Sequence, residues 1–277
     1  MNPQLQIKID RAIKLLRSIQ DMKPDEQIEI AYSGGKDSDV ILQLAKEAGI
    51  NYRAIYKNTT IDPPGTIKHV EEMGVEIMRP DITFFQLIAK KGMPSRFTRF
   101  CCYHLKEYPV LKTSVIGIRK EESTRRAMRY KEPTLCRIYP HGKHVEQIMP
   151  ILDWTTEDVR EFIEDRGIKL APVYYLPSGT IDYSRRLGCM CCPMANNKQR
   201  ISEFVNHPLL VRTWINAIER FWDSHPNARI RYWFSDVYEY FWVNLFFRSI
   251  HCTILNKDSQ HQENYKEKLE EYFKIKL

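Results

Sequence analysis

Short apolar runs rich in β-branched residues alternate with amphipathic stretches over the first two thirds of the chain. Five of these runs predict strands: Ile28–Ser33, Tyr52–Asn58, Val75–Pro80, Ser114–Arg119 and Val145–Leu152. Between the first two runs, helical spacing predicts a helix over about 37–48. Because strands that alternate with helices build parallel sheets, we expect an α/β fold with a parallel sheet sandwiched by helices.

The remaining pattern is helical. Thr155 and Asp158 form a candidate capping box for a helix that Gly167 ends. From about Ile201 the chain becomes helical and aromatic, with four of its five tryptophans. We favour a helical subdomain packed on the sheet over a platform for stacking bases. The expected organisation is an α/β domain over 1–200, which carries both cysteine clusters, and a helical aromatic C-terminal subdomain over 201–277.

Composition is that of an ordinary globular protein. Of 277 residues, 43% are hydrophobic and 28% are charged, which excludes wholesale disorder and collagen-like repeats. No window approaches 18 apolar residues, and the first twenty residues lack the apolar segment of a secretory signal. We therefore expect a cytoplasmic protein without membrane contact. The net charge of +7 suits a polyanionic partner, and a solvated lysine-rich surface explains it equally well.

The glycine pair in SGGKDS, residues 33–38, stands directly after a predicted strand and before a predicted helix. Two consecutive glycines let the backbone turn tightly, so that several N–H groups converge on an anion. The helix N-terminus adds partial positive charge and Lys36 adds a full charge, which suits a phosphate or pyrophosphate. The loop is not a Walker A motif, which needs glycine in place of Ile30 and Ser or Thr in place of Asp37.

SGGKDS after a first strand resembles the PP-loop of the ATP pyrophosphatase superfamily, which is also called adenine nucleotide α-hydrolase-like. There the loop holds the phosphates of an adenine nucleotide, which is cleaved between its α and β positions to adenylylate a substrate. The resemblance implies ATP with Mg²⁺ as ligands. It assigns nucleotide binding to Ser33, Gly34, Gly35, Lys36, Asp37, Ser38 and, after the second strand, Thr59.

Five of the seven cysteines fall in two clusters, Cys101-Cys102 and Cys189–Cys192. Clustered thiols in a reducing compartment more often bind metal or do redox chemistry than form disulfides. Four thiolates support tetrahedral zinc or an iron–sulfur cluster. Because adjacent cysteine side chains diverge, they suit the separate corners of a four-iron cube, so we favour the cluster and keep zinc as the alternative. Cys191 is a spare thiol that could replace a ligand, and Cys252 is read as a buried structural cysteine.

FCCYHLKEYPV and RLGCMCCP resemble the two cysteine segments of the sulfonucleotide reductases, the phosphoadenosine phosphosulfate (PAPS) and adenylyl-sulfate reductases. In the cluster-bearing members a CC pair and a distant CxxC bind [4Fe–4S]. Carried over, the ligands are Cys101, Cys102, Cys189 and Cys192. IGIRKEESTRR and PILDWTTEDVREFI resemble two further segments, so the likeness covers about residues 25–200. Arg119 and Arg125 in the first of these segments suit the role of oxyanion clamps, because guanidinium forks bind phosphate or sulfate bidentately.

The chain also departs from the reductases. The reductases attack sulfur with a thiolate in a C-terminal Glu-Cys-Gly-Leu/Ile-His motif. This chain ends EEYFKIKL and lacks that motif. Its late cysteine, Cys252, stands in an apolar run, where a thiol is a poor nucleophile. An intact SGGKDS is the form found in PP-loop enzymes that cleave ATP. Its combination with four cysteines resembles the PAPS-reductase-like subunits of DNA phosphorothioation systems and the cluster-dependent tRNA thiolation enzymes.

These resemblances imply ATP-dependent activation of an oxygen atom followed by sulfur transfer, with DNA or tRNA as acceptor and a sulfur donor or reductant protein as partner. In that mechanism Lys36 grips the pyrophosphate with the loop, Asp37 helps to place Mg²⁺, and Arg119 and Arg125 neutralise charge at the phosphates.

Three alternatives stay open. The first is a thiol-dependent reductase of adenylyl sulfate or PAPS, which uses Cys252 or an external thiol and releases sulfite. The second is a non-enzymatic nucleotide-sensing or DNA-binding regulator with a structural metal site. The third is adenylylation of sulfate, against which the four cysteines argue because that reaction needs no cluster.

Overall fold

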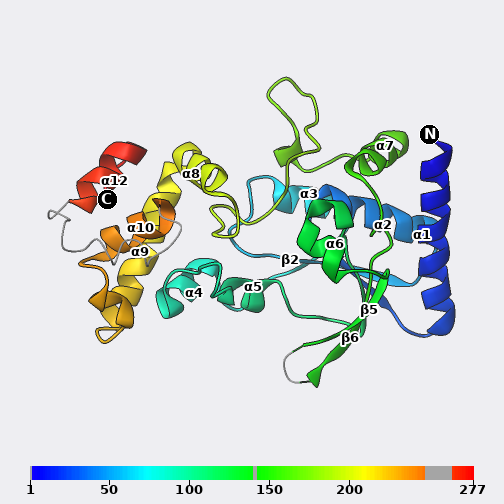
Figure 1. The fold of residues 1–277 in the computed structure, drawn as a ribbon, viewed down its shortest axis with the longest axis horizontal. Coiled ribbons are helices and arrows are strands. Elements are labelled where there is room, and N and C mark those ends of the chain that lie inside the picture. The colour runs from blue at the N-terminus through cyan, green and yellow to red at the C-terminus, as the bar shows by residue number, and fades with distance from the viewer. Residues whose placement is uncertain (1, 140–141, 247–263) are drawn as a thin grey trace. The chain divides into compact units, whose positions relative to one another are not determined.

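The computed structural model describes residues 2–139, 142–246 and 264–277 (Figure 1). Two compact units are formed. Unit 1 comprises Met1–Asn58, Asp62–Pro80 and Leu105–Gly188, and unit 2 comprises Thr59–Ile61, Asp81–His104 and Cys189–Leu277. This grouping differs from the predicted division at residue 200, because both cysteine clusters fall in unit 2 with the C-terminal helices. Cys252 lies outside the described residues.

Unit 1 is built on a six-stranded sheet of order β3-β2-β1-β4-β6-β5. Its strands are β1 (Ile28–Tyr32), β2 (Tyr52–Lys57), β3 (Glu76–Met78), β4 (Thr113–Val115), β5 (Thr134–Ile138) and β6 (His144–Ile148). Ile30 of β1 is in register with Ala54 of β2 and Val115 of β4, and both pairings are parallel. Only β5 and β6 pair antiparallel. The predicted α/β class with a mostly parallel sheet is confirmed.

The sequence pattern missed β5 and overextended β4. Four of the five residues of β5 are exposed, because the strand lies at the sheet edge and pairs only with β6. A strand with little burial lacks the apolar run or alternation by which strands are recognised. β4 ends at Val115, and the chain then turns so that Arg119 begins the 3₁₀ helix η1 (Lys120–Glu122).

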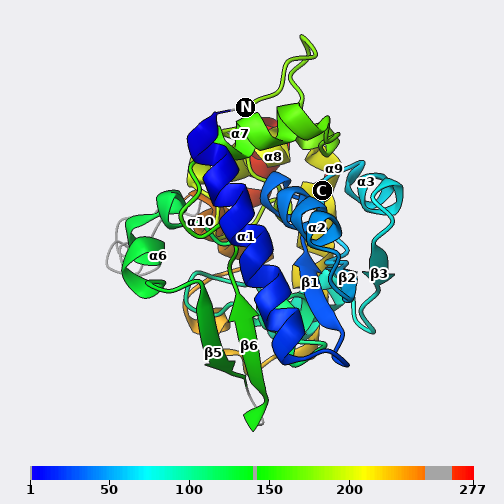
Figure 2. The same cartoon turned by 90° about the vertical axis from the view of Figure 1, so that its right-hand side faces the viewer.

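Helices complete unit 1. They are α1 (Pro3–Met22), α2 (Lys36–Ala48), α3 (Thr66–Glu72), α6 (Thr124–Arg129), α7 (Thr156–Arg166) and the 3₁₀ helix η3 (Pro172–Tyr174). α2 packs against both α1 and α7 (Figure 2). The predicted capping box is confirmed, because Thr155 Oγ1 accepts from Asp158 N at 3.1 Å and Asp158 Oδ2 accepts from Thr155 N at 2.6 Å. Gly167 ends the helix in the left-handed region, at φ 61°.

Unit 2 is helical. It contains α4 (Phe84–Lys91), nearly all of α5 (Phe100–Leu105), α8 (Asn197–Asn206), α9 (Pro208–Ser224), η4 (Arg229–Tyr232), α10 (Val237–Phe246) and α12 (Tyr265–Phe273). The Trp214 ring is fully buried, and the rings of Phe84, Phe204 and Phe241 lie 5.2, 5.9 and 6.3 Å from it. The aromatic residues therefore form the core of these helices, as the helical prediction implies. Among the described helices, none has the length and apolar character needed to cross a membrane.

Candidate functional site

The glycine pair forms the turn between β1 and α2. Gly34 has a φ of 74°, a conformation that favours glycine, and a Cβ there would lie 3.3 Å from Thr66 Cγ2. Ser38 Oγ donates to Gly35 O at 2.7 Å and accepts from Ser33 N at 3.2 Å. Gly35 is the N-cap of α2 and supplies no side chain to its first N–H groups. The loop therefore presents a helix N-terminus without a local cap, which is the feature that binds phosphate.

A tyrosine from a distant part of unit 1 contacts this helix start. The Tyr174 hydroxyl, on η3, accepts a hydrogen bond from Lys36 N at 3.0 Å. Burial raises the pKa of Tyr174 to about 12, so the phenol stays protonated at neutral pH. No sequence motif marks Tyr174, which lies in the loop that follows α7. A hydroxyl from a residue distant in the sequence thus accepts a hydrogen bond from the N-terminus of α2, and no side chain of the loop does so.

Lys36 is buried, with 4% of its surface exposed. Its Nζ donates to Arg185 O at 3.3 Å and lies 3.7 Å from Asp37 Oδ2. Burial lowers the pKa of Lys36, Arg119 and Arg186 lower it further, and Asp37 opposes them. Cations that repel one another at a helix N-terminus are stabilised by an added anion. The electrostatics of the loop therefore favour a phosphate ligand.

The structure brings Asp37 and Arg119 together, and the predicted role of Arg119 at the phosphates stays a prediction. Arg119 is 3% exposed, its Nε donates to Asp37 Oδ1 at 2.7 Å, and its Nη1 donates to Glu121 Oε2 at 2.8 Å. A Cβ on Gly117 would lie 3.3 Å from Asp37 Cβ, so a glycine is needed beside this pair. Arg119 is held by two carboxylates, and it orients Asp37.

Two other arginines lie near one another beside Glu122. Arg126 forms an ion pair with Glu122, and Arg186 Nη2 donates to the Glu122 carbonyl at 3.2 Å. Burial lowers the pKa of Arg126, and Arg186 lowers it further. Arg125, by contrast, is exposed on α6, and its predicted role at the phosphates stays a prediction. Arg186, which no sequence motif marked, is close enough to Lys36 to lower its pKa.

A buried polar cluster fixes the elements on either side of the loop. His69 Nε2, on α3, lies 3.0 Å from the Tyr32 hydroxyl at the end of β1 and 3.1 Å from Asp39 Oδ1 in the first turn of α2. The Tyr32 hydroxyl also donates to Asp39. Burial raises the pKa of Asp39. These contacts join β1, α2 and α3, so the loop between them has a rigid support.

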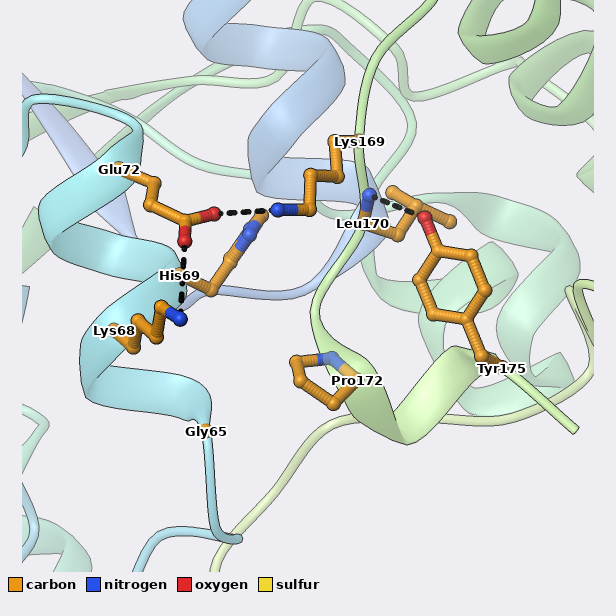
Figure 3. Close-up of a pocket in the computed structure, with 8 residues that line it drawn as sticks. All are labelled: Gly65, Lys68, His69, Glu72, Lys169, Leu170, Pro172 and Tyr175. Atoms are coloured by element: carbon orange, nitrogen blue, oxygen red, sulfur yellow. Dashed lines mark hydrogen bonds and ion pairs between the residues drawn. The ribbon is translucent and has the colours of Figure 1, made fainter. Parts of the chain in front are cut away.

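His69 also lines a cavity of about 320 Å³ between α3 and residues 169–175 (Figure 3). Two lysines border this cavity, and both pair with Glu72: Lys169 Nζ lies 2.9 Å and Lys68 Nζ 3.9 Å from its carboxylate. Glu72 thus offsets the charge of one of these two lysines, and the cavity keeps an excess positive charge.

The cysteines belong to unit 2, where contacts between three segments gather them. Arg96 donates to the carbonyls of Pro193 and Ala195, at 3.3 and 3.2 Å. Met190 N donates to Ile61 O at 2.8 Å. The segment 189–195 is therefore tied both to the loop before α5 and to residues 59–61.

Three of the four predicted ligand thiols interact. A hydrogen bond to Cys102, together with burial, raises the pKa of the Cys101 thiol, and Cys192 contributes to the same shift. Arg99 Nη2 donates to Cys102 Sγ at 3.6 Å. The fourth thiol, Cys189 Sγ, donates to Thr59 Oγ1 at 3.5 Å. Thr59, predicted to bind nucleotide, is thus placed beside a cysteine in unit 2, and its nucleotide role stays a prediction.

Cys191 differs from its neighbours. It is fully buried, its φ is 56°, and its backbone N–H donates to Glu203. Burial raises the pKa of its thiol. Within the described residues, no three or more Cys, His, Asp or Glu side chains are arranged so that they could hold a metal ion as they stand. The donor chemistry nevertheless fits a thiolate-bound metal centre, because two segments of one unit supply four partly exposed thiols.

The profile of the phosphoadenosine phosphosulfate reductase domain matches residues 27–195. The chain belongs to this family. The matched residues of this PAPS reductase domain include the loop at 33–38 and both cysteine clusters. α8 and the helices after it lie outside the match.

Three curated relatives share 22–25% identity with this chain over 63–76% of its length. An uncharacterised protein of Methanocaldococcus jannaschii is 25% identical over 76% of this chain and 53% of its own length. Sulfate adenylyltransferase subunit 2 of Rhizobium tropici is 22% identical and that of Agrobacterium fabrum 24%, each over 63% of this chain. The chain spans 65% of each of these two subunits. It therefore corresponds to part of the length of these relatives.

Solved structures with similar architecture come from several enzymes. PAPS reductase of Candida auris has a TM-score of 0.43 at 14% identity, over 62% of this chain and 90% of that one. FMN adenylyltransferase of Candida glabrata has a TM-score of 0.43 at 18% identity, over 62% and 59%. The U34-tRNA thiolase of Methanococcus maripaludis, solved with its [4Fe–4S] cluster, has a TM-score of 0.39 at 16% identity, over 81% and 82%.

Proposed function

We propose that this protein cleaves ATP between its α and β phosphates and couples that activation to sulfur transfer. The observation that carries the proposal is the buried Lys36 at the start of α2, with Arg186 close enough to lower its pKa. A buried cation at a helix N-terminus that its own loop leaves without a side-chain cap is costly unless an anion joins it. The pyrophosphate part of ATP supplies that anion.

Each residue of the loop has a role in this reaction. The hydroxyls and N–H groups of residues 33–38 bind the β and γ phosphates, and Lys36 and Arg186 neutralise charge that develops on the leaving pyrophosphate. Asp37 would hold Mg²⁺ through Oδ2, because its Oδ1 already accepts from Arg119 at 2.7 Å. Arg119 is accordingly a positioning residue, whereas Lys36 and Asp37 touch the substrate or its metal.

The proposed chemistry balances in two displacements. In the first, an oxygen of the acceptor bonds to the α phosphorus and the bond to the β-phosphate oxygen breaks, which releases pyrophosphate. In the second, a hydrosulfide-level sulfur bonds to the activated acceptor atom, which is carbon in a base and phosphorus in a backbone phosphate, its proton passes to solvent, and AMP leaves with the original oxygen. We propose a nucleic acid, tRNA or DNA, as acceptor, because its charge suits a chain of net charge +7.

We further propose that Cys101, Cys102, Cys189 and Cys192 hold a [4Fe–4S] cluster, which when bound would supply the site where sulfur is delivered. Anaerobic reconstitution with iron and sulfide tests this assignment by iron content and visible absorption. We expect C192A to lose the cluster and C191A to retain it, because the Cys191 thiol is fully buried. Equal iron in both variants would contradict the ligand assignment, and uptake of zinc instead of iron would identify the alternative metal.

Pyrophosphate release tests the activation step. Wild-type protein is mixed with Mg-ATP and, in separate reactions, tRNA, DNA or sulfate. We expect release to depend on a nucleic acid and to fall at least a hundredfold in K36A. K46A is the matched control, because Lys46 is exposed near the other end of α2. Equal loss in both variants would remove Lys36 from the mechanism.

Adenylylation of sulfate is the second candidate, because two relatives at 22% and 24% identity are subunits of sulfate adenylyltransferase. The same loop chemistry serves it, with a sulfate oxygen as the attacking group. Pyrophosphate release that requires sulfate and is indifferent to nucleic acid would establish it. A reductase is tested in parallel with adenylyl sulfate or PAPS and a thiol, and sustained release of sulfite would overturn our preference.

A further inference from the structure

Arg200, on α8, is a buried arginine with hydrogen-bond donors to spare. It is 4% exposed, and its Nη1 donates to the Asn244 carbonyl of α10 at 2.8 Å. Its Nε and Nη2 are fully buried and have no hydrogen-bond partner in the part of the chain that the structure describes. Leaving buried N–H groups of a charged side chain unsatisfied costs several kcal/mol in general. The guanidinium therefore lacks an anionic acceptor.

The groups around Arg200 indicate where that acceptor belongs. Burial lowers the pKa of Arg200 to about 10, so it stays charged at neutral pH, and the groups that oppose this shift are Cys191, Cys192 and Glu203. The Glu203 carboxylate accepts from the Cys191 backbone N–H and from Gln199 Nε2. Glu203 lies one turn from Arg200 on α8, so its contact with Cys191 places the second cysteine cluster beside the guanidinium.

Two other charged groups bear on this site. Arg96 adds positive charge and lowers the pKa of Arg200 further. It therefore does not neutralise the charge of the Arg200 guanidinium. The guanidinium of Arg96 itself donates to the carbonyls of Pro193 and Ala195, which follow the cluster. Two arginines thus border the cysteine segment 189–195, and of these two, Arg200 is the one with buried donors that have no partner among the described residues.

We infer that Arg200 is the cation that binds the anionic sulfur centre formed at the cysteine clusters, with Nε and Nη2 as its donors. This inference rests on the cluster that we propose above. A [4Fe–4S] core with four thiolate ligands carries net negative charge, whereas four neutral thiols do not. The orphaned donors of Arg200 gain acceptors only when the sulfur atoms are in the thiolate-bound form. Arg200 lies outside the matched family segment, residues 27–195.

Redox titration of the reconstituted cluster tests the inference. Positive charge and hydrogen bonds to the sulfurs favour the reduced, more negative form. R200M is therefore expected to shift the midpoint potential to more negative values, and R200K, which keeps a charge, to shift it less. R212M is the matched control, because Arg212 on α9 also donates to a backbone carbonyl, that of Lys276 at 3.0 Å. An unchanged potential in R200M, or an equal shift in R212M, would overturn the inference.

Stability of the metal-free protein separates this role from a structural one. A merely structural Arg200 predicts that R200M loses stability before metal is added and leaves the potential unchanged. Our inference predicts that metal-free R200M unfolds at the same denaturant concentration or a higher one, because buried donors without partners have been removed. If R200M does not fold, R200K decides, and a wild-type potential in R200K counts against the inference.

The two proposals fail in different ways. Wild-type protein that takes up neither an iron–sulfur cluster nor zinc overturns both of them. Wild-type protein that takes up a cluster whose potential ignores Arg200 overturns only the present inference. Should the metal be zinc, affinity replaces potential as the readout. R200M is then expected to bind zinc at least about tenfold more weakly in competition with a chelating dye, and equal affinity would refute the role.

Discussion

Replacing Lys36 by methionine should weaken ATP binding and strengthen the fold at the same time. The side chain is 4% exposed, and its nearest carboxylate oxygen, Asp37 Oδ2, is 3.7 Å away. Asp37 keeps Arg119 Nε at 2.7 Å in the variant, so the substitution does not leave a buried carboxylate without a partner. Methionine retains most of the side-chain volume and removes only the charge.

The effect on ATP follows from the loss of one hydrogen bond to a charged group. Such a bond contributes about 1.5–3 kcal/mol, which corresponds to an affinity roughly 10- to 100-fold lower in K36M. At an ATP concentration of 100 times the wild-type Kd, ATP stabilises the wild-type fold by about 2.7 kcal/mol. With a Kd 100-fold higher, the same concentration stabilises K36M by only about 0.4 kcal/mol.

The effect on the ligand-free fold has the opposite sign. The pKa of Lys36 is lowered in the folded state, first by burial and then by Arg119 and Arg186, so its charge opposes folding at neutral pH. Removing it should add about 1 kcal/mol to the free energy of unfolding, or about 2 °C in Tm. Because wild-type Lys36 loses its proton between the lowered pKa and the ordinary value of 10.5, the advantage of K36M should shrink as pH rises through that window.

Calorimetric unfolding with and without Mg-ATP, repeated from pH 7 to pH 10, measures both effects. K46M serves as the control, because Lys46 is exposed on the same helix and should change neither quantity by more than about 0.5 kcal/mol. The reasoning would be refuted by a K36M protein that is less stable without ATP and equally stabilised by it.

Further variants test the turn at Gly34 and an ion pair near the other end of α2. G34A forces an alanine to a φ of 74° with its Cβ 3.3 Å from Thr66 Cγ2, so we expect a stability loss of about 1–2 kcal/mol and loss of pyrophosphate release. G49A meets a similar φ, 68°, with open space around the Cβ, and should lose stability alone; activity loss in both would refute the distinction. Arg166 Nε donates to Glu47 Oε1 at 2.8 Å and lowers the pKa of Glu47. The ion pair therefore stabilises the fold fully above the ordinary pKa of 4.5, and this stabilisation is lost as pH falls through the lowered pKa. In urea titrations, E47Q should lower the free energy of unfolding by about 0.5 kcal/mol at pH 7 and approach wild type below about pH 4. A difference between the two proteins that does not change with pH would contradict the assignment.

The strands of the sheet interior were predictable because their residues are buried. The apolar runs that predict β1, β2 and β6 match the observed strands to within a few residues, since burial on both faces of a parallel sheet requires such runs. β3 was also predicted, although it lies at the other edge of the sheet and is only partly buried. β5 escaped prediction for the converse reason. Its edge position leaves Thr134, Leu135, Cys136 and Ile138 exposed, so pairing with β6 rather than its own sequence determines that it is a strand.

The candidate site divides in the same way. SGGKDS is local, and its glycine pair between a strand and a helix reveals an anion-binding turn without knowledge of the rest of the chain. Tyr174 and Arg186 are about 140 and 150 positions further along, and no local pattern marks either of them as a neighbour of Lys36. The role of Arg119 at the phosphates stays a prediction, and only the tertiary structure shows that Asp37 and Glu121 accept its hydrogen bonds.

The sequence by itself determined the backbone chemistry of the loop, the supply of thiols and the class of the fold, because these depend on residue type and short-range spacing. The tertiary structure alone decided that Cys101, Cys102 and Cys192 interact, that Arg200 has buried donors beside the second cluster, and that the cysteines share a unit with the C-terminal helices. These are contacts between residues far apart in the chain. Such contacts depend on how buried surfaces pack, which is information that no single segment contains.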